Sequence, residues 1–119
     1  MKLSSRALLT ATVVGTVLQV AMTGLGHTNP EIRGIYAGGG MGISFVAGIL
    51  YVVISTEVIL RDNVVGGAIA GAVCALAGIL VAWLFGDVPA TLLVMGTIFS
   101  AITGALGGWV GRLFSSGRV

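Results

Sequence analysis

Charged side chains are scarce in this chain. Only 8% of its 119 residues are Asp, Glu, Lys or Arg, whereas 56% are hydrophobic. The net charge of +2 is too small to indicate binding to nucleic acid. A soluble protein with so few charges would aggregate, because charged surface groups keep proteins in solution. The composition therefore predicts an integral membrane protein, with the lipid bilayer as its solvent.

Cysteine and catalytic motifs are also nearly absent. Cys74 is the only cysteine, which excludes an internal disulfide and a metal site built from several cysteines. No stretch matches a phosphate-binding loop, a zinc-protease helix or a pair of catalytic carboxylates. His27 lies in a predicted loop with no second histidine in the chain, so it indicates no metal site. We expect no catalytic residue, no metal, no cofactor and no soluble substrate.

The dominant feature that is present is a set of four apolar segments, Ala7–Leu25, Ile35–Val58, Val64–Phe85 and Thr91–Leu113. Each has about the 20 residues that a helix needs to cross the hydrocarbon core of a bilayer. The sequence therefore predicts an all-α fold, a single domain over residues 1–119 that forms a bundle of four transmembrane helices. The basic residues before the first segment resemble the start of a signal peptide, but the apolar run is long for one. We expect this segment to be retained as a span.

Basic residues predict the orientation of the bundle. With four spans, five of them fall on one side of the membrane, Lys2, Arg6, Arg61, Arg112 and Arg118. Arg33 alone falls on the other side. Short loops rich in Lys and Arg stay in the cytoplasm, so we expect both termini there. The expected location is the cytoplasmic membrane of a prokaryote or a viral envelope.

Residues that favour helix starts precede the segments. The candidates for N-caps are Ser4 or Ser5, Asn29, Asp62 or Asn63, and Asp87. Glu57 and Arg61 are four residues apart at the end of the second segment. This spacing and order favour an ion pair on the helix surface near the membrane interface.

Glycine is abundant, with 20 residues, and much of it recurs at every fourth position. Such rows of small residues, a glycine-zipper pattern, occur as Gly40, Ser44 and Gly48, as Gly67 and Gly71, and as Gly96, Ser100, Gly104 and Gly108. The second segment has a further row on an adjacent face, Gly34, Gly38 and Gly42. Residues four apart share one face of a helix, and small residues let helix backbones approach closely in lipid. These rows predict tight packing, either within the chain alone or also against another membrane protein.

The first segment carries a polar stripe instead, made of Thr12, Thr16, Gln19 and Thr23. Gln19 is the only amide or ionisable side chain deep in a span. One interpretation is that the stripe hydrogen-bonds to a neighbouring helix. The other is that it lines a polar path for a transported solute, together with the glycines at 38–40, where the helix could unwind.

Two glycine-rich stretches carry a resemblance, residues 66–71 (GGAIAG) and 104–108 (GALGG). With the four-span layout, they make the chain similar to small glycine-rich four-span membrane proteins of archaea, bacteria and viral envelopes. The resemblance implies a membrane bundle and no particular activity. Small multidrug-resistance transporters are similar in length, but they need a Glu within the first span, which this chain lacks.

The leading hypothesis is a non-enzymatic structural or accessory protein that packs with itself or with a larger membrane complex. A small homo-oligomeric transporter or channel is the alternative. A membrane-perturbing protein, such as a phage holin, is a third hypothesis.

Overall fold

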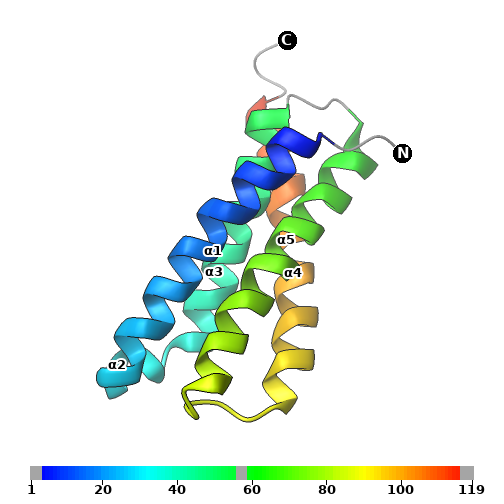
Figure 1. Cartoon of the computed structure of the whole chain (residues 1–119). Coiled ribbons are helices and arrows are strands. Elements are labelled where there is room, and N and C mark those ends of the chain that lie inside the picture. The colour runs from blue at the N-terminus through cyan, green and yellow to red at the C-terminus, as the bar shows by residue number, and fades with distance from the viewer. Residues whose placement is uncertain (1–3, 56–58, 116–119) are drawn as a thin grey trace.

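The computed structural model of the chain describes residues 4–55 and 59–115. Its helices are α1 (Ser5–Thr28), α2 (Pro30–Arg33), α3 (Tyr36–Ser55), α4 (Leu60–Leu84) and α5 (Thr91–Ser115), with no strand in these ranges. The four long helices run up and down side by side, and α2 lies between α1 and α3 (Figure 1). The prediction of an all-α bundle is confirmed.

All four long helices are long and apolar enough to cross a membrane. They contain 20 to 25 residues. At a rise of 1.5 Å per residue they are roughly 30–38 Å long, which matches the hydrocarbon core of about 30 Å. Their bounds agree with the predicted segments to within four residues where the structure describes them. The predicted second segment ends at Val58, which lies outside the described residues.

Local polar groups determine where the first helices start. Ser4 caps α1, because its hydroxyl oxygen accepts a hydrogen bond from the backbone N–H of Ala7 at 3.2 Å. Asn29 caps the short α2, where its side-chain oxygen accepts from the N–H of Glu31 at 3.0 Å. Pro30 follows at the first helical position, where no backbone N–H is needed.

The predicted caps of the last two spans are wrong. The N-cap of α4 is Ile59, which makes no side-chain hydrogen bond, and both Asp62 and Asn63 lie within the first turn. The N–H of Asn63 donates to the carbonyl oxygen of Ile59 at 3.1 Å, so the helix has already started there. Asp87 does not cap α5, which begins at Thr91. Its backbone instead helps to end α4, where Gly86 turns the chain with φ +78°.

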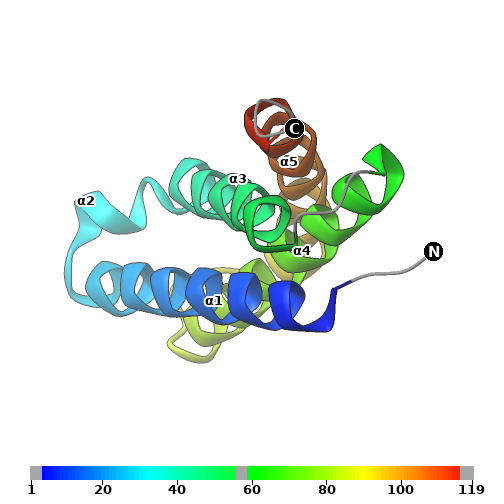
Figure 2. The same ribbon diagram turned by 90° about the horizontal axis from the view of Figure 1, so that it is seen from above.

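The helices α3 and α4 are central to the bundle, because each packs against all three of the other long helices. Viewed along the bundle, α1 and α5 lie on opposite sides of α4, and α3 packs against α5 as well (Figure 2). We call the end of the bundle with α2 and the 85–90 loop the hairpin end. We call the opposite end, where α1 begins and α5 ends, the terminal end (Figure 1).

Small side chains fill the interior and large ones cover the outside. The fully buried apolar residues are mostly alanines, Ala7, Ala11, Ala47, Ala70, Ala75 and Ala82. Large apolar side chains such as Leu9, Leu84 and Val94 are more than 60% exposed. A protein in water would bury these side chains, whereas lipid solvates them and leaves close backbone packing to hold the helices together. The surface of this bundle is therefore that of a membrane protein.

Candidate functional site

Three helices contribute polar side chains to a cluster in the bundle interior, Gln19 of α1, Ser44 of α3 and Cys74 of α4. All three side chains are buried. The amide nitrogen of Gln19 donates to the carbonyl oxygen of Gly40 at 3.0 Å and lies 3.4 Å from the hydroxyl oxygen of Ser44. The hydroxyl of Ser44 donates to the carbonyl oxygen of Gly71 at 3.1 Å. These bonds join α1, α3 and α4 inside the apolar core, as expected for interhelical hydrogen bonds in lipid.

The thiol of Cys74 completes this cluster. Its sulfur donates to the carbonyl oxygen of Gly71 at 3.3 Å and lies 3.9 Å from both the Gln19 amide nitrogen and the Ser44 hydroxyl oxygen. On its other side it packs against Gly15 of α1, where an added Cβ would lie 2.9 Å from the sulfur. The thiol therefore acts as a small packing residue here.

The structure divides the predicted polar stripe of α1. Gln19 and Thr23 are buried, whereas Thr12 and Thr16 are only half-buried. The buried face of α1 is a row at four-residue steps, Ala7, Ala11, Gly15, Gln19 and Thr23. Its first three members are small apolar residues at every fourth position, and this pattern in the sequence would have identified the buried face. The polar residues alone predicted a different face, which includes Thr12 and Thr16.

Backbone contacts between glycines join α3, α4 and α5. A Cβ on Gly67 of α4 would overlap the carbonyl oxygen of Gly104 of α5, and a Cβ on Gly104 would overlap the carbonyl oxygen of Gly67. Gly48 of α3 lies against the same Gly104 carbonyl. Nearer the hairpin end, a Cβ on Gly71 would lie 2.8 Å from the carbonyl oxygen of Ser100. The three helices therefore meet without side chains between them.

The remaining small residues of the predicted rows have different surroundings. Gly108 lies against the backbone of Asn63, at the start of α4. Gly96 faces the side chain of Ile79, and Gly40 faces the amide of Gln19. The row Gly38 and Gly42 of α3 is exposed, with no atom within 4 Å of an added Cβ at either position. Of the two rows on α3, the bundle interior therefore uses the one that contains Ser44.

A partly enclosed pocket lies between all four long helices toward the hairpin end. Its cavity volume is about 80 Å³, and the space up to its open mouth brings the empty volume to about 540 Å³. Its walls are mostly apolar and include Met22, Met41, Ile79, Leu92 and Phe99. Its polar side chains are Gln19, Thr23 and Ser100, and no charged residue lines it. The bundle therefore packs closely at the glycine contacts and contains a pocket between these contacts and the hairpin end.

A buried polar group also lies at the terminal end, on the first turn of α4. Asp62 is 1% exposed, and its Oδ1 lies 3.8 Å from the side-chain nitrogen Nε of Arg61. Asp62 was not predicted to be buried, because its place in a short loop suggested a solvated cap. The predicted ion pair between Glu57 and Arg61 involves Glu57, which lies outside the described residues.

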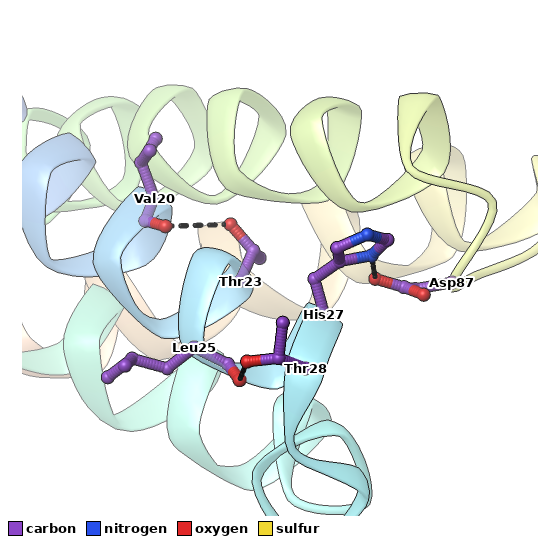
Figure 3. A network of polar contacts seen from close by, with 6 residues as sticks. All are labelled: Val20, Thr23, Leu25, His27, Thr28 and Asp87. Carbon is purple, nitrogen blue, oxygen red and sulfur yellow. Dashed lines mark hydrogen bonds and ion pairs between the residues drawn. The ribbon is translucent and has the colours of Figure 1, made fainter.

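At the hairpin end, His27 connects α1 to the 85–90 loop. It lies in the last turn of α1 and not in a free loop, as its sequence context had suggested. Its Nδ1 lies 3.0 Å from Oδ2 of Asp87, and its ring stacks at a tilt on Phe85 with centroids 4.5 Å apart. Figure 3 shows the imidazole pointing across at Asp87, while Thr23 and Thr28 bond to carbonyl groups of their own helix. The contact joins the two hairpins of the chain.

The chemistry available to these groups is limited. Within residues 4–55 and 59–115, no three His, Cys, Asp or Glu side chains lie close enough to hold a metal ion together. The central cluster contains no base beside the Ser44 hydroxyl or the Cys74 thiol that would activate either as a nucleophile. What the geometry offers is helix packing and a neutral, mostly apolar pocket.

Comparison with known proteins gave no match with a family model, a curated protein or a solved structure.

Proposed function

We propose that this protein is a non-enzymatic membrane protein with a structural or accessory role, and that it packs through a glycine row of α3 against another transmembrane helix. The partner helix belongs to a second copy of the chain or to a larger membrane complex. The observation that carries the proposal is the pair Gly38 and Gly42, which is exposed and where an added Cβ would meet no other part of the described residues within 4 Å.

The two glycine rows of α3 support this role by contrast. Gly48, in the row with Ser44, lies directly against the backbone of α5. Gly38 and Gly42 have the same four-residue spacing but face outward. Glycine lowers the stability of an isolated helix relative to alanine, so an exposed pair at this spacing has no benefit for α3 alone. In lipid, the same spacing lets a second helix approach closely.

The proposal includes an orientation. Arg6, Arg61 and Arg112 belong to the terminal end, and Arg33 belongs to the hairpin end. By the positive-inside rule the terminal end then faces the cytoplasm, and the α3 row lies in the half of the membrane away from it. The membrane would be the cytoplasmic membrane of a prokaryote or a viral envelope.

The test is the mass of the native complex after mild extraction into lipid nanodiscs, with its components identified. We expect a defined assembly for the natural chain and loss of that assembly in Gly42→Leu. Gly24→Leu is the matched control, because Gly24 of α1 is also exposed with nothing within 4 Å of an added Cβ. A monomer for the natural chain, or equal effects of the two variants, would contradict the proposal. A second subunit type in the assembly would distinguish an accessory role from self-association.

A small homo-oligomeric transporter or channel is the second candidate, and the pocket at the hairpin end favours it. The pocket contains Gln19 and Thr23 of the predicted polar path. Toward the terminal end, the contacts among Gly48, Gly67 and Gly104 close the interior of one chain. A complete path would therefore require a conformational change or several copies. This candidate predicts solute flux into proteoliposomes that Gln19→Leu abolishes while the bundle remains folded.

A further inference from the structure

We propose that the pocket at the hairpin end binds a neutral, mostly apolar ligand that donates a hydrogen bond to the side-chain oxygen of Gln19. The binding site lies within one chain, so this inference goes beyond the proposed function and does not depend on assembly. It rests on the hydrogen bonds of the Gln19 amide, the residues that surround its oxygen and the lining of the pocket.

The two ends of the Gln19 amide differ in their contacts. The nitrogen donates to Gly40 and lies within reach of the Ser44 hydroxyl oxygen. The oxygen accepts no hydrogen bond from any residue that the structure describes, although Gln19 as a whole is 2% exposed. The oxygen is not among the fully buried side-chain atoms that lack a partner, so it is open to the pocket, where a bound ligand would supply the donor.

Glycines on two neighbouring helices flank the unpaired oxygen. An added Cβ at Gly40 of α3 or at Gly78 of α4 would lie 3.4 Å from it. Both glycines line the pocket together with Gln19. With no side chain at either position, the oxygen remains accessible from the pocket.

The rest of the lining defines the ligand class. A pocket without a charged side chain disfavours an ion, and the walls of Met22, Met41 and Phe99 favour an apolar body. Methionine side chains adapt their shape to what they contact. The hydroxyl of Thr23 already donates to the carbonyl oxygen of Val20 at 3.0 Å, so it does not supply the missing donor for Gln19. The cavity volume is about 80 Å³, so the site suits a small molecule or one end of a larger one.

The occupant that fits is therefore an uncharged amphipathic molecule with a hydroxyl or amide donor at one end. A lipid acyl chain would also fill the apolar part of the pocket, but it has no donor for the Gln19 oxygen. The two occupants differ in one measurable property, which is whether binding depends on a hydrogen-bond donor.

The experiment compares two probes of nearly equal shape, 2-naphthol and its methyl ether, 2-methoxynaphthalene. Both are uncharged at neutral pH, and only 2-naphthol donates a hydrogen bond. Saturable binding to the full chain in nanodiscs is measured against protein-free nanodiscs of the same lipid, which removes partitioning into the bilayer. We expect 2-naphthol to bind about three- to tenfold more tightly than the ether, as one neutral hydrogen bond allows.

Two variants test the site. Gln19→Leu should abolish the preference for 2-naphthol. Leu92→Trp should block the pocket to both probes while it leaves the Gln19 hydrogen bonds in place, so it tests the site even if Gln19→Leu does not fold. Val94→Trp is the matched control, because Val94 is on the same helix and 64% exposed, and it should bind like the natural chain.

The proposal is overturned if the two probes bind equally, if no binding exceeds that of empty nanodiscs, or if Leu92→Trp binds normally. Gly42→Leu, which tests assembly, should leave binding unchanged. Failure of the pocket and failure of the α3 interface are therefore distinguishable.

Discussion

Gly67 of α4 and Gly104 of α5 lie so close together that neither position has room for a side chain. Each glycine lies where a Cβ would overlap the carbonyl oxygen of the other, so α4 and α5 touch along their main chains. In lipid, such contacts replace the burial of large apolar side chains as the source of helix association. The structure makes four predictions about these and related contacts.

The first prediction concerns this glycine pair. Gly67→Ala and Gly104→Ala should each lower the free energy of unfolding by about 1–3 kcal/mol, because the added methyl group forces two backbones apart. The measurement is thermal or denaturant unfolding in detergent or bicelles. Gly24→Ala is the control, since nothing lies within 4 Å of its added Cβ. Equal stability of all three variants would show that α4 and α5 do not make this contact.

The second prediction concerns Tyr51 and Gly66. The buried ring of Tyr51 occupies the space that a Cβ on Gly66 would need, and its hydroxyl oxygen accepts a hydrogen bond from the N–H of Ser4 at 3.2 Å. Gly66→Ala should therefore destabilise the bundle, and much less so when Tyr51→Leu is already present. A double-mutant cycle should give a coupling of about 0.5–3 kcal/mol. Additive effects would argue against the ring contact.

The third prediction concerns Gln19 and Ser44. Gln19→Leu and Ser44→Ala should be coupled by about 0.6 kcal/mol, and by no more than about 1.7 kcal/mol, which are typical of hydrogen bonds between membrane helices. The measurement is a double-mutant cycle on unfolding in bicelles. Thr10→Val with Gln19→Leu is the control, because the Thr10 hydroxyl bonds only within its own helix, to the carbonyl oxygen of Arg6. A coupling as small as in the control would mean that the central cluster is not formed.

The fourth prediction concerns His27 and Asp87. This contact is partly exposed, with 46% of the His27 side chain accessible. A cycle of His27→Ala and Asp87→Ala should therefore give a coupling of only about 0.2–1 kcal/mol. Asp87→Asn should lose less stability than Asp87→Ala, because it keeps a side-chain oxygen that can accept from the imidazole. Equal destabilisation by Asp87→Asn and Asp87→Ala would show that the hydrogen bond to His27 does not stabilise the folded protein.

Four long apolar helices, with bounds to within four residues, were predictable from the amino-acid sequence alone. Thr91 was predicted as the first residue of the last span and is the first residue of α5. Hydropathy is a local property of about 20 consecutive residues, and in lipid a backbone segment must satisfy its hydrogen bonds within itself. A helix is therefore predictable without knowledge of its neighbours. Ser4 shows the same for a helix start, because its cap depends only on the next three residues.

Which helix faces pack against each other was not predictable from the sequence in the same way. The two glycine rows of α3 are equivalent in spacing, and the contact with α5 selects the row that contains Gly48. On α1 the interior face includes Gln19 and Thr23 of the predicted polar stripe, whereas Thr12 and Thr16 are only half-buried. The contact between His27 and Asp87 joins residues 60 positions apart. Helix packing in lipid depends on the fit of two surfaces, and a pattern along one helix describes only one of them.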